Sequence, residues 1–272
     1  MSKSGKVDFH VHSNCSDGIF SPEEIVKVTA DAGLDAVGLT DHDTINGLSD
    51  AASAACQYSI ELIPGVEISV FENSKEIHIL GYYPRHENQL KEALIKLQKD
   101  RYARMEAIIG KLNRLGFNIR GEEVISEAGK AAPGRLHIAR VLRKKNYIHT
   151  LDQAFSNYLN RNRPAFVARK TYNLKQVISL LCDVGAIPVI AHPGMSCKSI
   201  IDNLIAMGLK GIEAFHPDHS PALVKYYQEL AQDKKLLITG GSDFHGDCRS
   251  KINYPVNLAV SEDYLTQMKQ ML

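Results

Sequence analysis

The residues best suited to chemistry are histidines and carboxylates that accompany short apolar stretches. His10 and His12 stand two apart in DFHVHS, and Asp17 lies in the turn that follows. In an extended strand, residues two apart project to the same face, so the two imidazoles are expected to point to one place. Further residues of these types end or lie within later apolar stretches, namely Asp41, His42, Asp43, Glu67, His78, His192, Asp243 and His245.

Taken singly, each of these residues has an ordinary structural role, such as a helix cap for Asp41 or Asp43 and a turn residue for Asp243. Taken together, six of the eleven histidines fall on or at the end of predicted strands, which indicates a metal site. Imidazole and carboxylate without thiolate suit Mn²⁺, with Zn²⁺ or Fe²⁺ as alternatives. The nine candidates other than Asp41 and Asp43 are too many for one ion. They predict two to three divalent ions, with Glu67 placed to bridge, a centre that can activate water against a phosphoester.

The elements that must position these residues alternate between strands and helices. Predicted strands cover 6–12, 35–43, 60–69, 76–83, 186–193, 209–217 and 235–245. A capping box at Ser21–Glu24, with Pro22 at the first helical position, begins a helix that Gly33 closes. Other helices are predicted over 174–184, 199–207 and 221–233. This alternation is typical of a parallel sheet or a (β/α) barrel, whose strand ends converge on one mouth.

The middle of the chain differs from both flanks. Residues 87–162 show a helical pattern throughout, including a long amphipathic helix that stops at Gly116, and the next strand is expected at RPAFVA, 163–168. From His86 to Lys170 there are 18 Lys+Arg against 8 Asp+Glu, whereas the rest of the chain has 14 against 23. A basic insertion beside an acidic metal site predicts an anionic substrate. The alternative for most of these cations is a solvated helix face.

Several classes of protein are disfavoured by composition. No apolar stretch approaches the roughly 18 residues of a membrane span, and the polar start MSKSGKVDF does not resemble a signal peptide. The five cysteines are widely spaced and form no CxxC pair, which disfavours a zinc ribbon or a disulfide framework. We therefore expect a reduced, cytoplasmic protein that does not associate with membranes.

Six ordered motifs carry a family resemblance: DFHVHSNCSDG, GLTDHD, PGVEIS, EIHILGY, AHPG and GSDFHG. They resemble the PHP (polymerase and histidinol phosphatase) family. The resemblance implies an α/β fold, a distorted, TIM-like (β/α)₇ barrel formed by residues 1–86 and 163–272, with an all-helical insertion at 87–162 that clamps the substrate. It also implies a trinuclear centre. The implied ligand sets are His10, His12, Glu67 and Asp243; Asp17, His42 and His245; and Glu67, His78 and His192.

One branch of the family fits best. Many histidinol phosphatases carry His where this chain has Asp17. Asp17 together with the insertion sequence PGRLHIAR, 133–140, is similar to 3′,5′-nucleoside bisphosphate phosphatases that also act as 5′-to-3′ exonucleases on short RNA. In that resemblance Arg135 and His137 bind substrate phosphate from the insertion. The competing interpretation is that both residues cap or solvate the start of a helix.

The resulting expectation is hydrolysis of the 3′-phosphate of a 3′,5′-bisphosphonucleotide, such as 3′-phosphoadenosine 5′-phosphate, by a metal-bound hydroxide. Asp243 is expected to take up a proton. His216 and His219, in FHPDHSP, are candidates to hold substrate or protonate the leaving group, and Lys170 and Tyr172 to line the mouth. A small phosphorylated nucleotide is thus the expected partner, with short RNA as a second. Histidinol phosphate hydrolysis and a non-catalytic metal-binding module stay open as alternatives, as do the metal's identity and the oligomeric state.

Overall fold

A single mixed sheet forms the centre of the protein. The computed structural model describes residues 5–72, 75–168, 171–246, 254 and 258–272, so the predicted mouth residue Lys170 lies outside the described residues. The strand order is β7-β6-β5-β4-β3-β2-β1-β8. The strands are β1 (Lys6–Val11), β2 (Ala36–Leu39), β3 (Glu61–Glu72), β4 (Lys75–Tyr82), β5 (Ile187–Ile190), β6 (Gly211–Phe215), β7 (Leu237–Gly240) and β8 (Val260–Ser261).

The sheet curls into a nearly closed barrel. Strands β1, β2 and β3 are parallel, as are β5, β6 and β7. Beyond β7 the chain returns to β1, because the amide of Asp243 donates to the carbonyl of His10 (3.0 Å) and that of His12 donates to Phe244 (3.0 Å). The predicted distorted α/β barrel is therefore confirmed. It carries a short eighth strand, β8, which pairs antiparallel with β1 and which the sequence did not predict.

One expectation about strand direction was wrong. Strand β4 runs antiparallel to both β3 and β5, so the barrel is not uniformly parallel. His78 therefore does not follow a strand end. It lies near the start of β4, which the reversed direction places at the same end of the barrel as the last residues of β3, where Glu72 pairs with Lys75.

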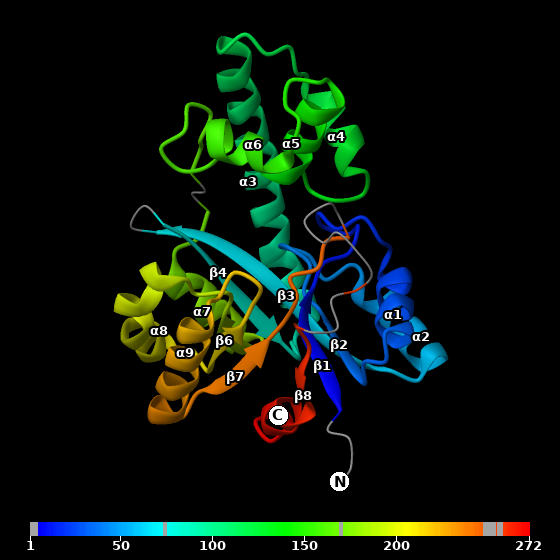
Figure 1. Ribbon diagram of the computed structural model, residues 1–272, viewed down its shortest axis with the longest axis vertical. Helices are drawn as coiled ribbons and strands as arrows, with labels where there is room; N and C mark the ends of the chain where they lie inside the picture. Colours follow the sequence, from blue (N-terminus) through cyan, green and yellow to red (C-terminus); the bar gives the residue numbers. More distant parts are fainter. Residues whose placement is uncertain (1–4, 73–74, 169–170, 247–253, 255–257) are drawn as a thin grey trace.

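Helices cover the outside of the barrel (Figure 1). They are α1 (Pro22–Asp31), α2 (Leu48–Tyr58), α7 (Leu174–Asp183), the 3₁₀ helix η2 (Met195–Ile200), α8 (Ile201–Met207), α9 (Pro221–Lys234) and α10 (Glu262–Lys269). The predicted capping box at Ser21 and Glu24 is present, and Gly33 follows α1 with φ of +77°. Helices α2 and α10 were not predicted. No helix in the described residues is long and apolar enough to cross a membrane.

A helical segment, which we define as residues 87–159, separates β4 from the second half of the barrel. It contains α3 (Glu87–Arg114), α4 (Gly121–Ala128), α5 (Arg135–Lys144), α6 (Leu151–Ala154) and the π-helix η1 (Phe155–Leu159). It stands over one end of the barrel, at the top of Figure 1. The early part of α3, with Leu90 and Leu97, packs in the core between sheet and helices. Its later part, with Ile108 and Leu112, packs in a core of the helical segment itself.

The strand expected at RPAFVA does not form. Residues 163–168 have no strand pairing and adopt turns and irregular backbone. Their carbonyls are bound by side chains of α3: Arg104 Nε donates to Val167 O (2.8 Å) and Lys111 Nζ donates to Phe166 O (2.6 Å). These side-chain donors replace the strand neighbour that a sheet would have supplied.

Candidate metal centre

The first strand places two imidazoles against two carboxylates from distant parts of the chain. His10 Nε2 lies 3.0 Å from His12 Nε2 and 3.2 Å from Glu67 Oε2. His12 Nε2 lies 3.2 Å from Asp243 Oδ1. The two histidines and Glu67 are buried, and Asp243 adopts φ of +51°, a backbone conformation that is costly for a non-glycine residue. The structure thus brings together four of the residues that the sequence singled out.

A second group lies beside the first. His245 Nε2 is 3.2 Å from Asp17 Oδ1, and His42 Nε2 is 4.0 Å from Asp17 Oδ2. His42 continues from β2 and forms an isolated bridge with Glu67, which aligns the two residues across neighbouring strands. His12 Nδ1 lies 3.9 Å from Asp17, so the first and second groups touch through His12.

Glu67 joins these groups to two further histidines. Its Oε1 lies 2.7 Å from His78 Nδ1 and 3.2 Å from His192 Nε2, while its Oε2 lies 3.1 Å from His42 Nδ1. The candidate ligands form three sets, and within each set the ligand atoms lie within 4.8 Å of one another. The sets are His10, His12, Glu67 and Asp243; His12, Asp17, His42 and His245; and His42, Glu67 and His78. Glu67 belongs to two of these sets and lies 3.1 Å from His42 of the other, and its bridging of metal ions stays a prediction.

Sequence reasoning missed Glu213, which supports the site from beneath. Its Oε1 lies 3.0 Å from His10 Nδ1, and its Oε2 accepts the amide of His192 at 2.7 Å. Glu213 is completely buried in β6. The available signal was a glutamate inside the otherwise apolar stretch GIEAF, since a buried carboxylate needs partners.

Asp41 also has a supporting place. It accepts hydrogen bonds from the amide and hydroxyl of Ser13 (2.7 and 2.6 Å) and from the Ser16 hydroxyl (2.6 Å). These bonds fix the turn that runs from His12 to Asp17. Asp41 therefore orders the loop that carries a candidate ligand.

Burial and charge work against each other in the site. Burial opposes ionisation of Glu67, but the histidines around it, His42 foremost, hold its pKa well below the ordinary glutamate value. Burial also disfavours a charged His12, yet the carboxylates of Asp243 and Glu67 raise its pKa to about 10. The cluster of carboxylates therefore attracts positive charge. Protons supply it in the absence of metal, and a divalent cation would displace them.

The donor set fits metal ions. Because the Glu213 carboxylate can only accept, His10 Nδ1 donates to it, and Nε2, which faces His12 and Glu67, is the ring nitrogen left to bind a metal ion once its proton is displaced. The buried Nδ1 of His42 has no hydrogen-bond partner among the described residues, although Glu67 lies 3.1 Å away. Converging lone pairs and carboxylate oxygens without thiolate are the environment of a divalent cation.

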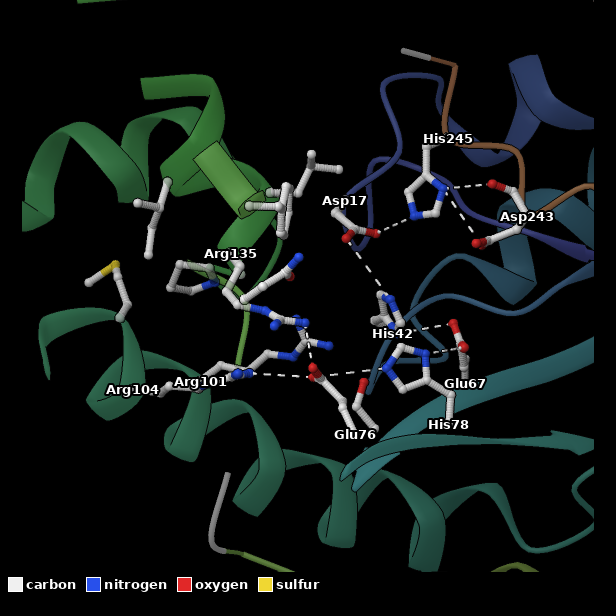
Figure 2. A pocket seen from close by; sticks show the side chains of 18 of the residues that line it. Asp17, His42, Glu67, Glu76, His78, Arg101, Arg104, Arg135, Asp243 and His245 are labelled. Carbon is white, nitrogen blue, oxygen red and sulfur yellow. Dashed lines mark hydrogen bonds and ion pairs between the residues drawn. The ribbon is translucent and has the colours of Figure 1, made fainter. Parts of the chain in front are cut away.

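A pocket of ≈ 460 Å³ opens between this cluster and the helical segment. Figure 2 shows three arginines on its far side: Arg101 and Arg104 from α3, and Arg135 at the start of α5. Glu76 of β4 lies among them, with its carboxylate 2.5 Å from Arg135 Nη2 and 3.8 Å from Arg104 Nη1. Histidines and acids thus form one wall of the pocket, and arginines with one counter-ion form the other.

The remaining predicted residues divide into those inside the pocket and those behind it. Arg135 and His216 line the pocket, and His216 Nε2 lies 3.6 Å from Asp243 Oδ2. His137 is buried, and its Nδ1 accepts the amide of Gly134 (3.0 Å), which caps α5. His219 Nδ1 donates to the Ala214 carbonyl (2.8 Å), so this ring packs behind His216. Tyr172 packs against the main core.

Known proteins resemble this chain over most of its length. The profile of the PHP domain family matches residues 8–238. The chain is 32% identical to a 5′-3′ exoribonuclease of Haemophilus influenzae, covering 89% of this chain and 91% of that protein. It is 29% identical to a phosphoribosyl 1,2-cyclic phosphate 1,2-diphosphodiesterase of Eggerthella lenta (88% and 94%). It is also 29% identical to a 3′,5′-nucleoside bisphosphate phosphatase of Chromobacterium violaceum (88% and 87%).

A solved structure shares the whole architecture. A candidate metal-dependent phosphoesterase from Bifidobacterium adolescentis superposes with a TM-score of 0.89 at 25% identity, covering 99% of this chain and 96% of that one. The helical segment and the barrel are therefore both within the range of the match.

Proposed function

This chain belongs to the PHP domain family and is a metal-dependent phosphoester hydrolase, and we propose that it removes the 3′-phosphate of 3′,5′-bisphosphonucleotides such as 3′-phosphoadenosine 5′-phosphate. The observation that carries the proposal is the arginine wall formed by Arg101, Arg104 and Arg135 across the pocket from the histidine cluster. A substrate with two phosphates can place one at each wall. Arginine is the side chain best shaped for a phosphate at the second.

The proposed metal ligands are the nine residues His10, His12, Asp17, His42, Glu67, His78, His192, Asp243 and His245, holding two to three divalent ions with Mn²⁺ favoured. Ions bound there would activate water and neutralise the phosphate oxygens. The barrel orients the ligands through Glu213 and Asp41. Proton transfer at the reacting phosphate falls to Asp243 and His216, which face the pocket 3.6 Å apart.

On the opposite wall, Arg135 binds the second phosphate in our proposal. In the structure its guanidinium is paired with Glu76, which must yield when a phosphate enters. His137 assists indirectly, because it caps the helix that begins at Arg135. This differs from direct contact by His137, which the family resemblance implied.

A second candidate activity is 5′-to-3′ cleavage of short RNA, favoured by the relative of that name at 32% identity. It uses the same two walls, with the terminal 5′-phosphate held by the arginines and the next phosphoester at the metal cluster. The two activities are compatible in one site, because the 3′-oxygen of a 5′-nucleotide is the leaving group in both. They differ in whether the attacked phosphate is a monoester, released as inorganic phosphate, or a diester, whose phosphate stays on the shortened RNA.

A comparison of kcat/KM values with Mn²⁺ tests the proposal. We expect 3′-phosphoadenosine 5′-phosphate to be preferred over histidinol phosphate. We expect 5′-phosphorylated oligoribonucleotides to be cleaved faster than the same oligomers with a 5′-hydroxyl. A preference for histidinol phosphate would overturn the assignment. That substrate has a single phosphate, so it gains nothing from an arginine wall across the pocket from the metal cluster.

A further inference from the structure

The helical segment reaches past the pocket and touches two loops that carry proposed metal ligands. Arg140, on α5, donates from Nη2 to the carbonyl of Asp17 at 2.8 Å. Arg101, on α3, contacts Asp43 Oδ2 through Nε at 2.5 Å, and Gln98 Nε2 donates to the Asp43 carbonyl at 3.0 Å. Asp43 directly follows the ligand His42. Both loops are therefore attached to helices outside the barrel.

These contacts are buried. Arg101 and Arg140 are 6% and 7% exposed, and Asp43 is fully buried. A buried arginine needs its partners, so breaking such a contact costs more free energy of folding than breaking an ion pair on the surface. Asp43 also has φ of +54°, and its amide donates to the carbonyl of Glu67 at 2.9 Å. Its backbone is thus fixed from the barrel on one side and from α3 on the other.

The other ligand group is held differently. His10, His12 and Asp243 are tied together by backbone hydrogen bonds between β1 and the chain after β7. Glu213, also from the barrel, orients His10. These supports come from barrel strands and their extensions. The Asp17 and His42 loops are joined to one another through Asp41, which accepts hydrogen bonds from Ser13 and Ser16, and each loop has a further anchor in the helical segment.

We propose that Arg101 and Arg140 are positioning residues for the metal site formed by Asp17, His42 and His245, so that the helical segment sets the affinity of one ion while the barrel holds another at His10, His12, Glu67 and Asp243. This inference rests on the proposed metal centre. Outer partners of metal ligands typically change metal affinity by roughly 10–100-fold when removed. The segment that carries the phosphate-binding arginine would then also complete the metal site.

The test is calorimetric titration of Mn²⁺ into the full chain after chelator treatment. Arg140→Met should weaken one binding step by roughly 10–100-fold and leave the tightest other step unchanged. Asp17→Asn identifies the affected step, because it removes a ligand of that site. Combined with Asp17→Asn, Arg140→Met should have little further effect, since both act on one site. Full additivity of the two changes would overturn the proposal.

Matched variants separate positioning from general damage. Arg135→Met lies on the same helix as Arg140 but pairs with Glu76, so it should leave the step defined by Asp17→Asn unchanged. Arg140→Lys, which keeps a donor, should restore part of the lost affinity. Arg101→Met should weaken the same step, with Arg101→Lys alongside it because Asp43 needs a counter-charge.

Two failures are distinguishable in this design. Wild-type protein that binds no Mn²⁺ would defeat the proposed function itself. Wild-type binding of two or more ions, with an Arg140→Met isotherm equal to it, would defeat only the role assigned to Arg140. Unfolding temperatures recorded for every variant identify those that lose the fold. For a variant that does not fold, the lysine substitution at the same position decides.

Discussion

The barrel and the helical segment contribute opposite chemistry to one pocket. The barrel supplies imidazoles and carboxylates from strand ends and their loops, on backbone fixed by sheet hydrogen bonds. The helical segment supplies arginines from α3 and α5, on helices with a hydrophobic core of their own. The difference suggests a division of labour, in which the barrel performs the reaction and the segment recognises the substrate's second charge.

The two regions also differ in how their charges are balanced. On the barrel side, the buried carboxylates face histidines that are charged only when protonated, so a metal ion can take the place of those protons. On the helical side, Glu76 already neutralises part of the positive charge of the arginine wall before any ligand binds. A phosphate must therefore compete with Glu76 for Arg135, whereas a metal ion competes only with protons on the histidines. Substitutions in the two regions should alter different kinetic parameters.

The largest effect is expected for His12→Ala. His12 belongs to two of the ligand groups, so its loss removes a donor that both use. We expect kcat to fall by at least roughly 10³-fold, because losing the ion's action costs several kcal/mol of transition-state stabilisation. The number of Mn²⁺ ions bound per chain should also fall, which elemental analysis measures. Intact phosphatase activity in this variant would refute the assignment of the barrel as the reaction centre.

Arg135→Ala should change recognition and leave the reaction largely intact. A charge-assisted hydrogen bond contributes about 1.5–3 kcal/mol, so KM for a bisphosphate should rise by roughly 10–100-fold. KM for an aryl phosphate, which has no second phosphate, should change little. Steady-state kinetics on both substrates provides the measurement. Equal changes for the two substrates would reduce Arg135 to a structural role and break the division between the regions.

The smallest expected effect concerns the stability of the helical segment. Burial lowers the pKa of His137 to about 4, against about 6.5 in an unfolded chain. The unfolded state therefore binds more protons between these values, so the stability is complete above pH 6.5 and is lost as the pH falls toward 4. At pH 5 the loss is about 2 kcal/mol, from 1.5 pKa units at 1.36 kcal/mol each.

His137→Gln supplies the matched control. Glutamine at this third helical position can also accept the N-cap amide, but it does not titrate. Denaturant unfolding at pH 7 and pH 5 should show a smaller drop for the variant than for the wild type. An equal drop in both proteins would mean that His137 does not couple the segment to pH.

Parts of this arrangement could be predicted from local sequence. The two-residue spacing of His10 and His12 and the capping box at Ser21 act over a few residues, and both predictions agree with the structure. The stop of α3 near Gly116 has the same origin, since that glycine takes φ of +92°. Such features depend on backbone geometry that neighbouring residues determine by themselves.

Other parts depend on contacts between distant residues. The direction of β4 follows from its hairpin with β3, for which the four polar residues ENSK, 72–75, just before predicted strand 76–83 were the available signal. Arg101 and Arg104 look like ordinary charges on an amphipathic helix, and only the packing of α3 against the barrel turns them toward the pocket. The role of Glu213 requires knowing that β6 passes beneath His10.

In our proposal, metal held by the barrel acts on the 3′-phosphate while the arginine wall holds the other phosphate. Chromatography of the products formed from 3′-phosphoadenosine 5′-phosphate tests it most directly, with chelated enzyme and with enzyme resupplied with Mn²⁺. We expect no turnover after chelation, and conversion to the 5′-monophosphate and inorganic phosphate once Mn²⁺ is returned. Release of the 3′-monophosphate, or turnover that survives chelation, would contradict it.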